Sequence, residues 1–155
     1  MWVPPEIKEP FILHHPTKKS IGYYGAVRIR DGKYIYSRED DKFNGATFFS
    51  FMKKLHRIGK RSGRKVGVIL DNASYHHAKV HIKWREKNKD TLLLEFMPAY
   101  SPELNPIERI WKQTRRKGTH NRYFKSINEL ITAVEGVFIN WQIRSDDLKT
   151  LCAIN

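Results

Sequence analysis

Two short apolar runs constrain the fold of this sequence more than any other feature. The runs are Val66–Leu70 and Thr91–Phe96, and residues 77–87 between them have a helical pattern. A strand, a helix and a second strand in this order form a parallel pair, and continuous apolar runs are typical of strands buried on both faces. We therefore expect an α/β fold in which these two strands form the parallel part of a sheet.

The residues before this unit predict an antiparallel start to the same sheet. Residues 21–29 and 33–37 have the composition of strands, and Asp31-Gly32 between them is a hairpin turn signal. Residues 47–58 carry apolar side chains at the spacing of an amphipathic helix. The predicted sheet therefore begins with a hairpin, continues with parallel strands and is flanked by helices.

Two more helices are expected after the second strand. One begins with Asn105 as N-cap and Pro106 at the first helical position. The other follows Ser126 and Glu129, which have the spacing of a capping box. Its apolar face is predicted to contain the following residues: Ile127, Leu130, Ile131, Val134, Phe138 and Trp141.

The chain divides into three parts on composition. Residues 1–20 contain four prolines and are expected to be irregular, residues 21–142 form one domain, and residues 143–155 form a C-terminal tail. The single cysteine excludes an intramolecular disulfide framework. The apolar runs are too short for a transmembrane helix, and the first residues do not resemble a signal peptide. We therefore expect a cytoplasmic protein.

Charge distribution indicates a polyanionic partner. The chain has 29 lysines and arginines against 16 aspartates and glutamates, a formal net charge of +13. Two stretches, residues 42–70 and 109–128, contain no acidic residue. We expect DNA phosphates to contact these stretches, although solvated helix faces are the alternative. The candidate DNA-binding residues are Lys53, Lys54, Arg57, Lys60, Arg61, Arg64, Lys65, Arg109, Lys112, Arg115, Arg116 and Lys117.

Two acidic residues occupy positions suited to chemistry. Asp71 directly follows the strand Val66–Leu70, and ligands of open α/β sheets bind beyond the carboxyl ends of strands. Glu108 lies in the first turn of the helix that begins at Asn105. Each has a structural alternative: Asp71 can form a turn, and Glu108 can close a capping box. Carboxylates of this kind are the ligands that Mg²⁺ and Mn²⁺ take in phosphodiester chemistry.

Two segments resemble the signatures of a known family. Residues 68–76, Val-Ile-Leu-Asp-Asn-Ala-Ser-Tyr-His, resemble a segment of transposases of the mariner-like superfamily, in which a strand is followed by Asp-Asn and a later His. Residues 98–111, Pro-Ala-Tyr-Ser-Pro-Glu-Leu-Asn-Pro-Ile-Glu-Arg-Ile-Trp, resemble the second signature, most closely in the bacterial and archaeal insertion-sequence branch. The predicted hairpin is similar to the family's second and third strands, so the resemblance covers about residues 20–142.

The resemblance implies an RNase H-like fold and a DDE nuclease and strand transferase of DNA transposition. In that family three acids bind two Mg²⁺ or Mn²⁺ ions, and by position Asp71 resembles the second acid and Glu108 the third. These two are our candidate catalytic and metal-binding residues. The remaining motif residues are expected to shape the site: Asn72, His76, Ser101, Pro102, Asn105 and Pro106.

The sequence departs from the family pattern at the first acid. The family's first aspartate lies on a strand before the hairpin, whereas the first aspartate here is Asp31, inside the turn. We expect the first strand and its acid to lie upstream of Met1, in a split, frameshifted or decayed reading frame, and cleavage by this chain alone to be weak or absent. An unpaired sheet edge would follow, with a homodimer or an upstream transposase fragment as partner.

Two alternative functions remain open. The first is a catalytically inactive, DNA-binding remnant of a transposase, which would bind DNA at the nucleoid without metal-dependent cleavage. The second is a zinc protein that uses His77 and His81, an i, i+4 pair on the predicted helix; no third ligand of clear spacing accompanies them.

Overall fold

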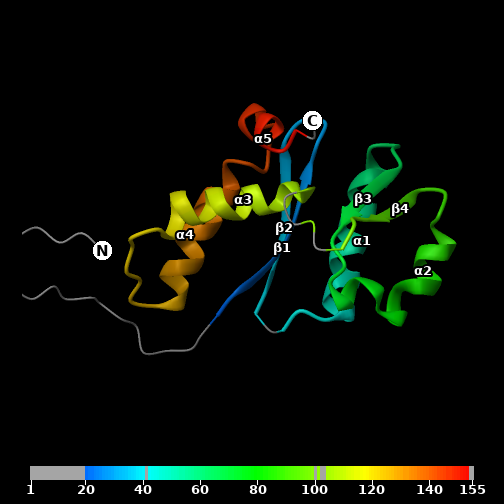
Figure 1. Ribbon diagram of the computed structural model, residues 1–155, viewed down its shortest axis with the longest axis horizontal. Coiled ribbons are helices and arrows are strands. Elements are labelled where there is room, and N and C mark those ends of the chain that lie inside the picture. The colour runs from blue at the N-terminus through cyan, green and yellow to red at the C-terminus, as the bar shows by residue number, and fades with distance from the viewer. Residues whose placement is uncertain (1–19, 41, 100, 102–103, 154–155) are drawn as a thin grey trace, which may run out of the picture.

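The computed structural model describes residues 20–40, 42–99, 101 and 104–153 (Figure 1). Its helices and strands are β1 (Gly22–Arg28), β2 (Lys33–Glu39), α1 (Gly45–Arg61), β3 (Val66–Leu70), α2 (Ile82–Lys87), β4 (Leu92–Phe96), α3 (Pro106–Thr114), α4 (Ile127–Ile139) and α5 (Asp146–Leu151). Short 3₁₀ turns precede α2, and a π-helical turn, Arg115–Thr119, follows α3.

The predicted hairpin is present. β1 and β2 pair antiparallel, with Arg28 opposite Lys33. Gly32 in the turn has a φ of +67°, which glycine reaches without steric cost. The turn is held by the Asp31 carboxylate, which accepts two hydrogen bonds from the Arg28 guanidinium at 2.6 and 2.7 Å. This bidentate pair lowers the pKa of Asp31.

Helix α1 begins earlier and ends later than its apolar spacing predicts. The Asn44 side chain accepts hydrogen bonds from the backbone of Ala46 and Thr47, and the Thr47 hydroxyl accepts one from the Asn44 backbone. This reciprocal cap starts the helix at Gly45. The buried face carries Phe48, Phe51, Met52 and Leu55.

The helix predicted over residues 77–87 is only partly confirmed. Residues Ser74–His77 and Lys79–His81 form 3₁₀ turns, and the α-helix begins at Ile82. Ala78 between the two turns is extended, with a ψ of 138°. A Cβ on Gly45 would meet the Ala78 side chain, so Ala78 lies against the start of α1. The helix is therefore interrupted where Ala78 contacts α1, and the spacing of apolar residues does not predict that interruption.

The predicted burial of both faces of the parallel strands is wrong. β3 and β4 pair in parallel, with Val66 opposite Leu92. Helix α1 covers one face, where Val68 and Leu92 pack. On the other face the Ile69 side chain is 49% exposed and the Leu93 side chain 56%. None of the described elements covers that face.

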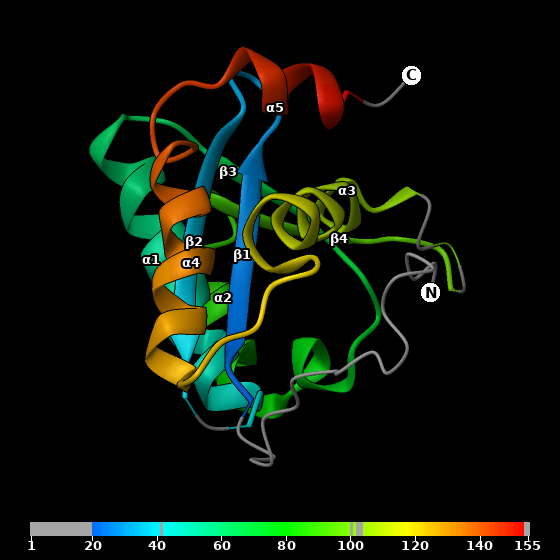
Figure 2. The same ribbon diagram turned by 90° about the vertical axis from the view of Figure 1, so that its left-hand side faces the viewer.

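The predicted single sheet is found as two separate two-stranded sheets. Among the described residues, β1 pairs with β2 and β3 pairs with β4, and no ladder joins the two pairs. Figures 1 and 2 show α1 beside both pairs, with α3 and α4 on the opposite side of the hairpin from α1. The α/β class and the mixture of antiparallel and parallel pairs are confirmed; the continuity of the sheet is not.

The buried apolar residues form two cores. One lies between α1 and the strands, and the other lies between the hairpin and the C-terminal helices. It contains Tyr34, Ile110, Phe138, Leu148 and Cys152, all fully or almost fully buried. The last two belong to the segment 143–155, in which no helix was predicted; α5 forms there and packs into this core. Two hydrogen bonds hold α5 in place. The Ser145 backbone N–H donates to Asp31 O at 3.0 Å, and Cys152 Sγ donates to Pro106 O at 3.7 Å.

Only one of the two hydrogen bonds of the capping box predicted for α4 is present. The Ser126 hydroxyl accepts a hydrogen bond from the Glu129 backbone at 3.2 Å. The Glu129 carboxylate accepts one from the Lys125 backbone instead of the Ser126 backbone that a capping box requires. Val134, Phe138 and Trp141 are buried as predicted.

Candidate functional site

Asp71 combines a turn with an accessible carboxylate. It directly follows β3, and its side chain is 53% exposed. Its Oδ1 accepts a hydrogen bond from the Ala73 backbone at 3.0 Å, which is the turn expected of an Asx residue. No bond from a described residue reaches its other oxygen. The structural and the chemical interpretation of Asp71 are therefore compatible, because each uses a different oxygen.

His76 fixes the orientation of Asp71. Its Nδ1 lies 3.0 Å from Asp71 Oδ1 and 3.0 Å from the Asp71 backbone oxygen. Both oxygens are acceptors, so Nδ1 carries the hydrogen and donates it. Burial lowers the pKa of His76, and the adjacent Asp71 opposes that shift only in part. The imidazole is therefore neutral near pH 7 and acts as a buried clamp on the acid.

The motif residues around Asp71 connect the two parallel strands. Asn72 Nδ2 donates to Met97 O at 2.7 Å, which ties the end of β3 to the end of β4. Tyr75 contacts the His76 ring edge-on, with 4.5 Å between the ring centroids. The sequence interpretation did not select Tyr75, although its place one residue before His76 was a usable signal.

The start of α3 meets the same cleft as Asp71. Asn105 and Pro106 line that cleft together with Asp71 and His76. Asn105 caps the helix as predicted, because its Oδ1 accepts a hydrogen bond from the Ile107 backbone at 3.3 Å. Elsewhere in the motif, the Ser101 hydroxyl donates to Ala99 O at 3.3 Å, and Pro102 lies outside the described residues.

Glu108 lies one residue beyond the cleft lining, on the exposed side of α3. Ile107 lines the cleft and Ile110 is buried, whereas the Glu108 side chain faces solvent. The alternative of a capping box is not realised, since among the described residues only the Glu108 backbone bonds Asn105. The carboxylate therefore stays available in the first turn, where the helix dipole stabilises negative charge.

Asp71 and Glu108 have the donor chemistry that Mg²⁺ or Mn²⁺ requires. Both offer hard carboxylate oxygens, both are exposed, and no described cation forms an ion pair with Glu108. Proteins hold these ions through few carboxylates, and phosphate oxygens complete the coordination. The described residues contain no group of three acids, histidines or cysteines suited to a metal. The residue types of Asp71 and Glu108 therefore fit the ion.

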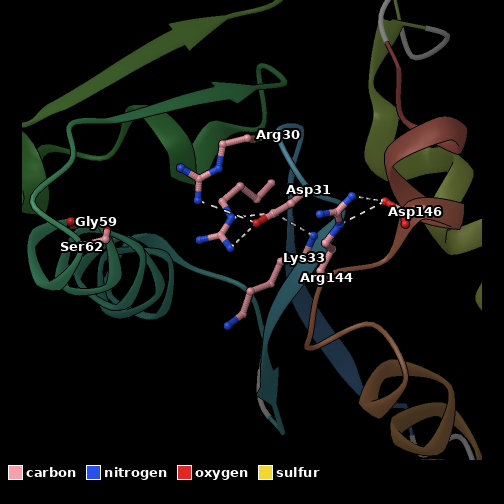
Figure 3. Close-up of polar contacts among 8 residues, drawn as sticks. Arg30, Asp31, Lys33, Gly59, Ser62, Arg144 and Asp146 are labelled. Atoms are coloured by element: carbon pink, nitrogen blue, oxygen red, sulfur yellow. Dashed lines mark hydrogen bonds and ion pairs between the residues drawn. The ribbon is translucent and has the colours of Figure 1, made fainter.

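The cleft has a volume of about 710 Å³ and differs in charge between its two ends. Asp71 lines it where β3 ends, and Arg64 and Lys65 line it where β3 begins. Arg30 of the hairpin turn joins these cations; the sequence interpretation did not select it. Figure 3 shows Arg30 beside Asp31 and, apart from them, Gly59 and Ser62 at the end of α1. Arg30, Gly59 and Ser62 all line the cleft.

The basic residues of α1 are not equivalent. Lys53, Arg57, Lys60 and Arg61 are exposed and form no ion pair with a described residue. Lys54 instead donates from Nζ to Tyr36 O at 2.5 Å and to Ser37 Oγ at 3.3 Å. Partial burial also lowers the pKa of Lys54. Lys54 therefore attaches α1 to β2 and is a poor candidate for a phosphate contact.

The basic residues at the end of the second motif and after it also differ in their contacts. Arg109 Nη1 donates to the backbone oxygens of Leu151 and Ala153, so it caps the end of α5. Lys117 Nζ lies 5.6 Å from the centroid of the Trp141 ring. Lys112, Arg115 and Arg116 are exposed. Figures 1 and 2 show α1 and α3 on opposite sides of the hairpin, so the two basic groups belong to different parts of the fold.

The zinc alternative has little geometric support. His77 stacks on Phe96, with 4.4 Å between ring centroids, whereas His81 is buried and its Nε2 donates to Tyr75 O at 3.3 Å. The part of the chain that the structure describes offers them no third ligand.

A separate expectation concerns membranes: none of the described helices has the length and apolar character needed to span a bilayer.

Comparison with known proteins gives a match over most of the chain. The family model described as DDE superfamily endonuclease matches residues 1–131. That range contains Asp71, Glu108 and every other residue placed in the candidate site.

Two curated proteins are similar to this chain. "Uncharacterized protein y4pE/y4sA" of Sinorhizobium fredii (strain NBRC 101917 / NGR234) is 33% identical over 85 residues, which are 54% of this chain and 59% of that protein. "Insertion element IS630 uncharacterized 39 kDa protein" of Shigella sonnei is 28% identical over 114 residues, which are 72% of this chain and 32% of that protein. The chain therefore spans only part of the length of each relative.

Proposed function

Because the chain belongs to the DDE superfamily endonuclease family, we propose that it takes part in metal-dependent DNA cleavage and strand transfer during transposition, as in the mariner-like branch with its RNase H-like core. The observation that carries the proposal is the position of Asp71: an accessible carboxylate at the end of β3, clamped by His76 and lining one cleft with the start of α3. The resemblance of the Shigella relative to this chain, with its insertion-element name, supports the same function.

Each residue of the site has a defined task in this proposal. Asp71 and Glu108 would hold Mg²⁺ or Mn²⁺, which when bound activates a water or a DNA 3′-hydroxyl and stabilises the leaving oxygen. His76 keeps one oxygen of Asp71 turned toward the protein, so that the other points outward. Asn72 holds the strand ends together beneath the acid. The third ligand is expected from residues outside the described part or from another chain.

DNA is the proposed partner, and the exposed cations are its proposed contacts. Lys53, Arg57 and Lys60 lie on α1, Arg115 and Arg116 lie in the turn after α3, and all five are exposed. Phosphate contacts of this kind supply affinity without sequence specificity. A chain that binds DNA in this way is expected to act at the nucleoid.

A plasmid-nicking assay tests the proposal. We expect the purified chain to nick supercoiled plasmid slowly in Mn²⁺ and not in EDTA, and the variants Asp71→Asn and Glu108→Gln to lose that activity. A matched control is Asp90→Asn, because Asp90 is an exposed acid in the turn before β4. Nicking that survives both site substitutions would refute the assignment of these two acids.

Direct metal binding separates the proposal from the inactive alternative. Titration of Mn²⁺, followed by calorimetry or by the electron paramagnetic resonance of the free ion, should show weaker binding by Asp71→Asn than by the unaltered chain. Salt-dependent DNA binding together with no Mn²⁺ binding and no nicking would favour the DNA-binding remnant instead.

A further inference from the structure

The first turn of α3, which carries Glu108, is attached to the C-terminal end of α5. Arg109 directly follows Glu108, and its Nη1 donates to Leu151 O at 2.9 Å and to Ala153 O at 3.2 Å. Leu151 is the last residue of α5. The last carbonyl groups of a helix have no partner within it, and an arginine side chain can supply one. Arg109 therefore joins two segments that are far apart in the sequence.

A second contact joins the same two segments on the other side of Glu108. Cys152 Sγ donates to Pro106 O at 3.7 Å. The Cys152 side chain is fully buried, in the core that also contains Ile110 and Leu148. The first turn of α3 is therefore attached to the end of α5 both before and after Glu108.

Helix α5 has a fixed place against the hairpin turn. A helix of six residues is too short to be stable alone, so its place depends on tertiary contacts. The Ser145 backbone N–H donates to Asp31 O at 3.0 Å. Gly32 lies so close that a Cβ on it would collide with the backbone of Ser145 and Lys149. The hairpin turn thus holds α5, and α5 holds the first turn of α3.

The second turn of α3 is held separately, by β1. A Cβ on Gly25 would lie 2.9 Å from the Trp111 ring, so the indole packs directly on the strand backbone. Successive residues of an α-helix lie about 100° apart around its axis. The contacts of Arg109 and Trp111 together therefore fix the rotation of α3, and that rotation sets the direction of the Glu108 side chain.

Arginine suits this task better than lysine. One guanidinium nitrogen carries two N–H groups in a rigid plane, and at Arg109 it serves two carbonyl oxygens. A lysine side chain is one bond shorter and lacks this planar fork. It would keep the positive charge that a phosphate contact requires. The two residue types therefore separate a role in positioning from a role in DNA binding.

We propose that Arg109 is a positioning residue for Glu108, with α5 as the support to which it bonds. The inference rests on the proposed function, because it takes Glu108 as a metal ligand. Without the two bonds from Arg109, the first turn of α3 is attached less firmly and the Glu108 carboxylate samples more directions. The metal must then order that turn when it binds, so its affinity falls.

Mn²⁺ titration of the full chain by calorimetry tests the proposal. We expect Arg109→Ala to weaken Mn²⁺ binding roughly 3- to 10-fold, a smaller effect than that of a residue which bonds the ligand directly. Removal of a positive charge beside Glu108 would by itself strengthen binding of the cation. Weaker binding therefore reports on position, and unchanged or tighter binding by Arg109→Ala overturns the proposal.

Two further variants control for charge. Arg109→Lys keeps the charge and loses the planar fork, so its Mn²⁺ affinity should fall as well, and an affinity equal to that of the unaltered chain would overturn the proposal. Lys149→Ala removes an exposed cation from α5 and should change the affinity by less than about twofold. A loss in Lys149→Ala as large as that in Arg109→Ala would also contradict the proposal.

Amide hydrogen exchange separates this inference from the proposed function. If the unaltered chain binds no Mn²⁺, the proposed function is wrong, and amide exchange alone decides the role of Arg109. Residues 107–110 should exchange at least about threefold faster in Arg109→Ala and Arg109→Lys than in the unaltered chain, whereas residues 24–27 of β1 should not change. Equal exchange at residues 107–110 would show that Arg109 does not fix the turn and would overturn the inference.

Discussion

His76 Nδ1 lies 3.0 Å from a carboxylate oxygen of Asp71 and 3.0 Å from the backbone oxygen of the same residue. A single buried imidazole thus holds both the side chain and the main chain of the candidate catalytic acid. The pair joins the end of a strand to the 3₁₀ turn that follows it. This relationship gives the motif histidine a positioning role with a measurable consequence.

His76→Ala should weaken Mn²⁺ binding by about 10- to 100-fold, because outer ligands that orient a metal-binding carboxylate have effects of this size. Calorimetric titration of Mn²⁺ measures the change. The matched control is His77→Ala, since His77 stacks on Phe96 and has no described bond to Asp71. Equal Mn²⁺ affinity of the two variants would contradict the positioning role.

The stability of the domain should fall as the pH decreases from about 7 to about 5. Burial lowers the pKa of both His76 and His81 below the ordinary value of 6.5. Below that value the unfolded chain binds more protons than the folded chain, so the free energy of unfolding decreases with decreasing pH. His81→Gln cannot titrate and should show a smaller decrease in urea unfolding at the two pH values. An unchanged difference would exclude His81 as a contributor.

Gly32→Ala should destabilise the domain more than Gly63→Ala. Both glycines have positive φ values, 67° and 63°, so both variants carry backbone strain of about 1–3 kcal/mol. A Cβ on Gly32 would also collide with the backbone of Ser145 and Lys149, whereas a Cβ on Gly63 meets nothing within 4 Å. Thermal unfolding of the two variants measures the difference, and equal melting temperatures would argue against the packing of the hairpin turn on α5.

Leu148→Ala should lower the free energy of unfolding by about 2–5 kcal/mol, the usual cost of truncating a buried leucine. The Leu148 side chain is 1% exposed in the core that contains Tyr34 and Phe138. Ile143→Ala is the control, because Ile143 is 71% exposed and its truncation should have little effect. Chemical unfolding would show whether the C-terminal helix belongs to the folded domain.

Arg57→Ala should reduce DNA affinity and lower the slope of log affinity against log salt concentration by about 1. Lys54→Ala should leave that slope unchanged and lower the melting temperature, because its ammonium group binds β2. Fluorescence anisotropy with a labelled duplex at several salt concentrations measures both. A reduced slope for Lys54→Ala would show that this lysine contacts phosphate after all.

Local sequence patterns predicted the types of most elements. The Asp31-Gly32 turn, the apolar runs of β3 and β4 and the Asn105 cap of α3 depend on neighbours in the chain, and all three are confirmed. The break at Ala78 and the burial of Leu148 depend on contacts with distant residues. Periodicity carries no information about such contacts, so it predicted one continuous helix over residues 77–87, of which only Ile82–Lys87 is α-helical, and no helix within residues 143–155.

The candidate site shows the same division. The two motifs placed Asp71 after a strand and Glu108 in the first turn of a helix, and both positions are as the sequence predicts. Their catalytic role remains a prediction. The sequence did not distinguish Lys54 and Arg109, which bind backbone oxygens of distant segments, from the neighbouring cations for which no such bond is found among the described residues.

The sequence by itself determined the order of strands and helices, the two motifs and the excess of positive charge, because these follow from composition and from residues close along the chain. Only the tertiary structure decided that the two strand pairs remain separate sheets, that His76 clamps Asp71, and that Asp71 lines one cleft with the start of α3. The physical reason is that hydrogen-bond direction and burial depend on which segments pack together, and residues far apart in the sequence make those contacts.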